Sequence, residues 1–199
     1  MKRRELLSAY ARGRRDFRGV VMRGVNLSEA CLPGSDFSEA DLSGAKFQRA
    51  DLTGARFQRA MLRRTRFQGA VLTGASFLWA AMLGVLLLAA HLMNADFRHA
   101  HLGGADLSFA NLTGATLRSA CLTDADLSDA NLTDTDFSEA SLFGARLVRA
   151  NLNHTRICAA DVRIADFRHA RFRSVQWWQT DLSKVIWTEE DHWDDARWS

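Results

Sequence analysis

The side chains that most often carry out chemistry are spread through this sequence at regular intervals. Asp or Asn recurs at spacings of five residues or a multiple of five, for example at Asp36 and Asp41 and again at Asp126 and Asn131. Two carboxylates can act as general acid and base only where a pocket gives them different environments. Evenly repeated carboxylates do not form such a pair, and the sequence has no phosphate-binding glycine loop, zinc-protease motif or nucleophile elbow. We therefore expect no catalytic residues and a protein that is not an enzyme.

The cysteines and the apolar segments indicate the cellular compartment of the protein. Cys31, Cys121 and Cys158 are odd in number and show no C-x-x-C spacing, which disfavours a disulfide framework and indicates a reducing compartment. The opening MKRRELLSAY lacks the apolar core of a secretory signal. The longest apolar run, from Phe77 to Ala90, is shorter than the roughly 18 to 20 residues that span a membrane. We expect a cytoplasmic protein without membrane segments.

An internal repeat determines the secondary structure that positions the recurring Asp and Asn side chains. Every fifth residue from Phe17 to Trp187 is apolar without interruption, and the residue two places before each is mostly Ala. This period fits neither a helix nor a long strand, which repeat about every 3.6 and 2.0 residues. It fits a very short strand, with its first and third residues pointing inward, followed by a two-residue bend. Most glycines stand at the fifth position of the unit and Pro33 at the fourth, where a turn favours them.

Units such as Ala-Asp-Leu-Ser-Gly at 40–44 and Ala-Asn-Leu-Thr-Gly at 110–114 resemble the pentapeptide-repeat family, and the resemblance extends over residues of about 14 to 187. It implies an all-β fold, a right-handed quadrilateral β-helix in which four units form one coil and residues twenty apart stack. With about 4.8 Å between rungs, about nine coils would make a rod of roughly 40 Å. The opening segment also resembles the cap and first coil of cyanobacterial members, heterocyst regulators among them, which implies a regulatory role.

The two ends of the repeat differ from its middle and predict caps. Residues 1–13 predict a capping helix with Leu6, Leu7 and Tyr10 on one face and Gly13 as its stop. Residues 14–187 form the predicted β-helix, and residues 188–199 a C-terminal cap in which Thr188 begins a short acidic helix. An aromatic lid over the last coil, rather than a ligand site, is our interpretation of the tryptophans at this end, Trp177, Trp178, Trp187, Trp193 and Trp198.

Stacking every twentieth residue predicts the interior. Rings such as Phe37 and Phe57 line one inner edge, and we expect the column of mostly leucine that includes Leu32 and Leu52 at the opposite edge. The same stacking brings His101, near His99, under Cys121, but the next rung supplies only Ser141. A metal site needs about four ligands, so we predict no metal and no cofactor.

Charge is distributed in bands along the predicted axis. Residues 1–73 carry a net +8, residues 74–93 carry none, residues 94–140 carry −6 and residues 141–187 carry +5. Arginines cluster in two places, but an acidic coil lies between them and outward aromatic side chains are few, which disfavours direct nucleic-acid binding. The acidic band consists of Asp124, Asp126, Asp129, Asp134, Asp136 and Glu139.

The family resemblance offers a second interpretation of this acidic band. Some pentapeptide-repeat proteins are thought to imitate DNA and bind DNA gyrase, protecting it from quinolone-type poisons. Mimicry requires acidic side chains that follow the rod as phosphates follow a duplex, one charge per about 1.7 Å of axis. A band of about one coil flanked by arginine disfavours this function. A DNA-mimicking, topoisomerase-binding protein remains the alternative interpretation.

The uncharged coil, residues 74–93, indicates a function more specifically than the acidic band does. Its outward positions carry large apolar side chains where other coils carry Ser, Thr, Arg or Gly, and such a surface usually marks a partner site or a self-association site. The candidate partner-binding residues are Leu78, Trp79, Leu83, Leu86, Leu88 and Met93. The sequence therefore predicts a non-enzymatic interaction or regulatory module that binds a protein partner through the outer faces of a rigid β-helix.

Overall fold

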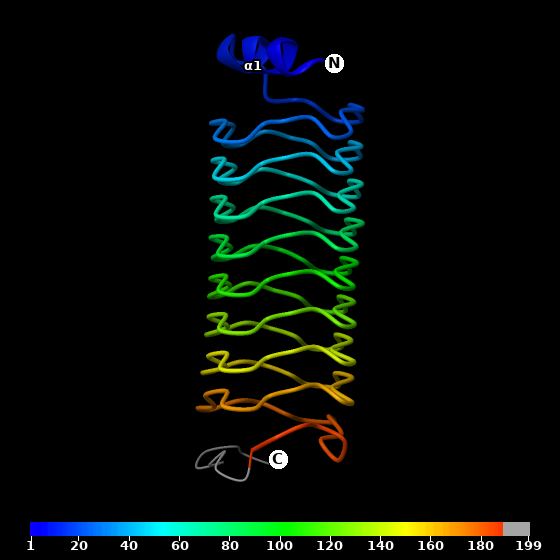
Figure 1. Ribbon diagram of the computed structural model, residues 1–199, viewed down its shortest axis with the longest axis vertical. Helices are drawn as coiled ribbons and strands as arrows, with labels where there is room; N and C mark the ends of the chain where they lie inside the picture. The colour runs from blue at the N-terminus through cyan, green and yellow to red at the C-terminus, as the bar shows by residue number, and fades with distance from the viewer. Residues whose placement is uncertain (189–199) are drawn as a thin grey trace.

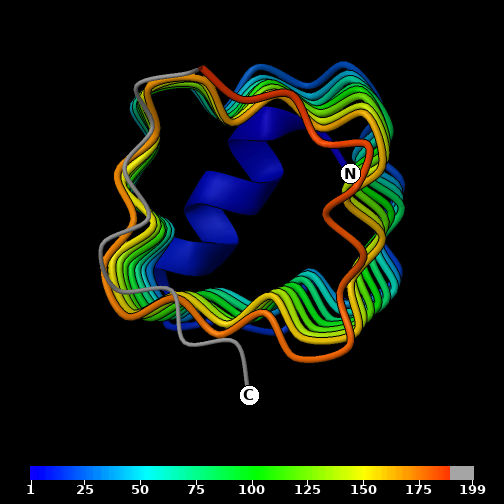
Figure 2. The same ribbon diagram turned by 90° about the horizontal axis from the view of Figure 1, so that it is seen from below.

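A computed structural model describes residues 1–188 of the chain. The single helix of this part, α1 (Arg3–Ala11), precedes a stack of four-sided coils (Figures 1 and 2). Each coil contributes one bridge residue per side, and each bridge is parallel and joins residues twenty apart, from Asp16↔Asp36 to Asp166↔Ile186. Among residues 1–188 the strands are these isolated bridges and nothing longer, because the chain turns after every bridge. The acidic helix predicted to follow Thr188, and Trp193 and Trp198, lie outside the described residues.

Each unit joins its neighbours through a fixed set of backbone hydrogen bonds. The N–H of Phe37 donates to the carbonyl of Arg56 in the next coil at 2.7 Å, and the N–H of Asp36 donates to Arg15 in the previous coil at 2.8 Å. The N–H of Ala40 closes the turn on the carbonyl of Phe37 at 3.1 Å. The fifth residue of the unit has a positive φ, 68° at Gly44 and 62° at Glu39. This explains the glycines found there, since only glycine adopts that conformation without steric cost.

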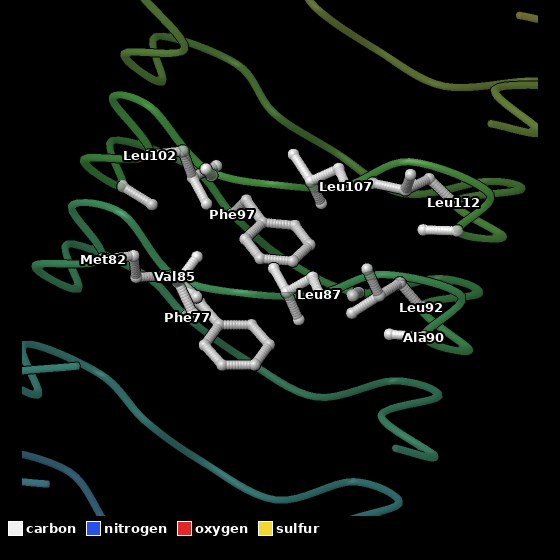
Figure 3. Close-up of a cluster of buried hydrophobic side chains, with 14 of the residues drawn as sticks. Phe77, Met82, Val85, Leu87, Ala90, Leu92, Phe97, Leu102, Leu107 and Leu112 are labelled. Atoms are coloured by element: carbon white, nitrogen blue, oxygen red, sulfur yellow. The ribbon is translucent and has the colours of Figure 1, made fainter. Parts of the chain in front are cut away.

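The inward positions form one continuous core. The apolar third residue and the Ala two places before it are buried from Leu27 to Ala170, and some of these positions are only partly buried in the end coils. Figure 3 shows two successive rungs of this packing, with Phe77 below Phe97. Where Thr replaces Ala, its hydroxyl finds an acceptor. Thr65 donates to the carbonyl of Leu42 at 3.0 Å, and Thr135 donates to that of Leu112 at 3.0 Å. A threonine can therefore occupy this position without losing its hydrogen bond.

The arrangement of rings in the core corrects one sequence-based expectation. Phe37 stacks on Phe57 with ring centroids 5.4 Å apart, and Phe47, half a coil away, contacts Phe37 edge-on at 6.2 Å. Rings from opposite sides therefore meet in the middle of the coil. The leucine column that includes Leu32 lies beside the Phe37 column, because its unit directly precedes that side of the square, and our prediction that it lies opposite is wrong.

Helix α1 lies across the N-terminal end of the stack (Figure 2). Leu6 is fully buried against the core, and the Tyr10 hydroxyl donates to the carbonyl of Pro33 at 3.0 Å. The guanidinium of Arg15 lies 3.7 Å from the centre of the Tyr10 ring. The helix thus covers apolar surface that the first coil would otherwise expose.

Candidate functional site

The functional surface is built from the three outward residues of each unit, distributed over four sides. Side 1 begins with residues 15–19, side 2 with 20–24, side 3 with 25–29 and side 4 with 30–34, and each side repeats every twenty residues. In every unit the bridge residue and the two turn residues face outward. Residues of one side that occupy the same unit position therefore form a column along the rod.

The structure distributes the six candidate partner-binding residues over all four sides of one coil. Leu78 and Trp79 belong to side 1, Leu83 to side 2, Leu86 and Leu88 to side 3, and Met93 to side 4. Of these, Leu83 and Trp79 are the most exposed, at 53% and 50%, whereas Leu78 and Leu86 are half-buried. A single partner surface that meets one side of the rod cannot contact all six.

Trp79 lies at the corner where side 1 ends and side 2 begins, and apolar side chains continue from it across side 2. Ala81 is the bridge residue of that unit, Leu83 lies near the far edge, and Met61 is the bridge neighbour of Ala81 one rung below. Met61 is 43% exposed. We call these four residues, Met61, Trp79, Ala81 and Leu83, the Trp79 patch.

Two neighbours hold the large side chains of the Trp79 patch in place. The Trp79 ring stacks on His99 of the next rung, with centroids 4.1 Å apart and planes 8° from parallel. Leu83 leans over Gly103, where its Cδ1 lies 3.2 Å from the position a Cβ would take. On the other flank of Trp79, an open depression of about 270 Å³ is lined by Ser38, Glu39, Gln58, Arg59, Leu78 and Trp79.

The backbone of Trp79 is in the left-handed region, with φ of 60°. Other fifth positions of side 1 carry Gly19, Glu39 or Ser119, which are smaller or polar. For a residue with a Cβ this conformation costs roughly 1 kcal/mol, and glycine avoids that cost. A half-exposed indole at such a position contributes little to the core and costs some stability.

The acidic band does not form a continuous face either. Asp136 and Glu139 lie on side 1, Asp124 on side 2, Asp126 and Asp129 on side 3, and Asp134 on side 4. Arginine neutralises part of it, because Arg149 forms a salt bridge to Asp129 at 2.6 Å and Arg118 forms one to Glu139 at 3.3 Å. Asp126 and Asp136 accept hydrogen bonds from the N–H groups of Ser128 and Ser138, which ties these carboxylates to their own turns.

Sequence reasoning missed the short-range ion pairs that recur within single units. In Asp16-x-Arg18, Asp96-x-Arg98 and Asp166-x-Arg168 the arginine bonds both oxygens of the aspartate two residues earlier. The side-chain and backbone hydrogen bonds of Arg18 lower the pKa of Asp16 to about 2. The Asp-x-Arg spacing is visible in the sequence. It predicts an ion pair only once both side chains are known to point outward from the same unit.

The histidine and cysteine side chains come together only in part. His101 and Cys121 are bridge neighbours, and Cys121 Sγ lies 3.5 Å from Thr123 Oγ1. Within the described part of the chain, no group of three or more His, Cys, Asp or Glu side chains could hold a metal ion. The same part contains no helix long and apolar enough to cross a membrane.

A comparison with known protein families identifies the same five-residue repeat. The family model for pentapeptide repeats matches the chain in 8 copies, over residues 16–38, 21–59, 50–87, 90–129 and 120–157. No curated protein matches the sequence.

Solved structures of similar shape cover almost the whole chain. HetL, a pentapeptide repeat protein involved in heterocyst differentiation regulation from the cyanobacterium Nostoc sp. strain PCC 7120, is 25% identical over 95% of this chain and 98% of its own, with a TM-score of 0.55. A trypsin-treated form of QnrB1, a plasmid-mediated fluoroquinolone resistance protein, is 22% identical over 87% of this chain and 91% of its own, with a TM-score of 0.76. Full-length QnrB1 is 20% identical over 87% of this chain and 94% of its own, with a TM-score of 0.62. At these identities QnrB1 shows the shared β-helix fold and no more.

Proposed function

This chain belongs to the pentapeptide-repeat family, and from that premise we propose that it is a non-enzymatic interaction module that binds a protein partner through the outer sides of its β-helix. The family also leads us to expect a right-handed helix of about nine coils, and the residues at its two ends lead us to expect caps at 1–13 and 188–199. A regulatory role is in keeping with the involvement of HetL in the regulation of heterocyst differentiation. The three free cysteines favour a reducing compartment, so we place the protein in the cytoplasm.

The observation that carries the proposal is the exposed indole of Trp79. It lies in a coil without any charge, is half-exposed, and occupies a backbone position that favours glycine. Tryptophan is strongly enriched among the residues that dominate binding energy at protein interfaces. A rigid rod also loses little conformational entropy when it binds, because its surface is ordered beforehand. We therefore assign partner binding to the Trp79 patch, together with the open depression that Leu78 and Arg59 line beside it.

Replacing Trp79 with glycine separates a binding role from a folding role. We expect the variant to melt within about 2 °C of the wild type, because lost ring contacts are offset by the relaxed backbone. Capture of the partner by the immobilised protein from a lysate of its source organism should fall at least about tenfold. Leu83→Ser should weaken capture in the same direction.

The matched control is Ile164→Gly. Ile164 has the same unit position, a φ of 53° and 47% exposure, and it lies on side 2 four rungs away from the Trp79 patch. Capture that survives in Ile164→Gly and disappears in Trp79→Gly supports the assignment. Equal capture by wild type and Trp79→Gly rejects it.

Binding to a topoisomerase as a DNA mimic is the alternative function. QnrB1, which shares the fold, is described as a fluoroquinolone resistance protein. The charges of this chain do not favour that function, since its acidic side chains are split over four sides and partly paired with arginine.

A further inference from the structure

Side 3 carries its charges in an order that is complementary to itself. Its bridge residues form one column in which two cations precede a leucine and two anions follow it. In rung order these residues are Lys46, Arg66, Leu86, Asp106 and Asp126. When a second copy of this column is reversed about Leu86 and laid against the first, each of these two cations meets an anion and the leucine meets itself. Arg146, the next residue of the column, meets the neutral Asn26.

These charges lack ion-pair partners of their own. Across residues 1–188, no salt bridge involves Lys46, Arg66, Asp106 or Asp126. Lys46 and Arg66 are exposed. Asp106 accepts hydrogen bonds from the N–H and the hydroxyl of Ser108, which hold the carboxylate at the outer surface. These hydrogen bonds do not neutralise its charge. The column is thus available to a charged partner surface.

We propose that side 3 is the interface of an antiparallel dimer of this chain. Two rods that face each other through the same side, related by a two-fold axis in the plane of contact, run in opposite directions and align each column with itself. With the axis at Leu86, Arg66 of each copy faces Asp106 of the other, and Lys46 faces Asp126.

The column of fifth positions on side 3 obeys the same symmetry. Arg49 comes opposite Asp129, and Glu29 comes opposite Arg149, so the two intrachain pairs join into one network between copies. Phe109, which is 61% exposed, comes opposite Gly69, which has no side chain of its own and lies beside the Arg49 side chain. The fourth positions of side 3 form the remaining outward column. There Leu88 comes opposite its own copy, and the other side chains that face each other are small or polar, so no like charges meet.

The other three sides lack this property. On side 1, an axis at Ser76 places Arg56 opposite Asp96 but also sets Asp16 against Asp136. On side 2 the charged bridge residues are aspartates, Asp41 and Asp161 among them, which cannot pair with each other. On side 4 an axis at Asn111 brings Asp51 opposite Arg171, which is one kind of opposite-charge pair against the two of side 3. The complementarity therefore distinguishes side 3 from the sides that carry the Trp79 patch, and the inference goes beyond the proposed partner binding.

The proposed interface is small. Seven rungs, from Glu29 to Arg149, extend roughly 29 Å at about 4.8 Å per rung, which gives a small interface by the standard of stable complexes. We expect a reversible dimer with a dissociation constant in the micromolar range, weakened by salt because charges contribute much of the contact.

Charge reversal tests the interface without removing any buried group. In the full chain, Arg66→Glu places two carboxylates opposite each other twice per dimer, and Asp106→Arg does the same with two cations. Each variant alone should dimerise on the order of tenfold more weakly than the wild type in sedimentation velocity at low salt. An equimolar mixture of the two should dimerise again, because Glu at 66 then faces Arg at 106 and the native pair faces the other way.

Arg56→Glu is the matched control, since Arg56 is an exposed bridge residue on side 1, away from side 3. It should dimerise as the wild type does. A wild type that stays monomeric at high micromolar concentration and low salt overturns the proposal, as does a mixture that dimerises no better than its components. Because Trp79→Gly leaves side 3 intact, loss of dimerisation and loss of partner capture are separate results.

Discussion

Replacing Phe57 with alanine should lower the free energy of unfolding by about 3 to 5 kcal/mol, the usual cost of deleting a buried ring. Phe57 is fully buried and stacks on Phe37 and Phe77, with centroids 5.4 and 5.1 Å away. Phe47 and Phe67 contact it edge-on at 6.2 and 5.8 Å. The cavity would open where rings from two sides meet, and rigid coils above and below would prevent its collapse.

Thermal unfolding followed by circular dichroism measures the effect. For a chain of this size we expect the midpoint to fall by roughly 10 °C. The control is Phe57→Leu, because Leu117 fills the equivalent position three rungs further on, and this variant should lose only about 1 kcal/mol. An alanine variant that melts with the leucine variant would mean that the ring column does not support the rod.

Enlarging Ala105 to leucine should cost roughly 1 to 3 kcal/mol, for the opposite reason. Ala105 is 1% exposed and points into the core beside the apolar third residues. The backbone cannot move away to admit three more carbon atoms, because Asp106, directly after it, donates its N–H to Val85 and accepts one from Leu87 at 3.0 and 2.7 Å.

An outward threonine provides the control for Ala105→Leu. From the sequence alone Thr113→Leu is a suitable choice, but the Thr113 hydroxyl bonds Asn111 and accepts a hydrogen bond from Asn131. Thr73→Leu is cleaner, since no side-chain hydrogen bond of Thr73 is present within residues 1–188. Equal melting temperatures for Ala105→Leu and Thr73→Leu would contradict the inward direction of Ala105.

The five-residue period was sufficient to predict much of the fold. It assigns a direction to each side chain of a unit, so the burial of Leu42 and Ala45 and the turn at Gly44 follow from their positions alone. The stacking period of twenty also places Trp79 next to His99, which could have been read from the sequence.

Other features needed the three-dimensional arrangement. The six apolar candidates are close in sequence, but one coil turns through four corners within twenty residues, so Leu83 and Met93 face opposite directions. Whether Arg149 reaches back to Asp129 depends on rotamers that no periodicity determines. The side-by-side rather than opposite placement of the Leu32 and Phe37 columns follows from the order of the sides around the square.

The central claim is that this rod binds a partner through the apolar Trp79 patch and does not act as an acidic imitation of DNA. Supercoiling by purified DNA gyrase, with and without a quinolone, tests it most directly when the full chain is titrated into the micromolar range. We predict that the chain neither inhibits supercoiling nor protects the enzyme from the drug, because its acidic side chains do not follow one side of the rod. Inhibition or protection that persists in Trp79→Gly would contradict the account.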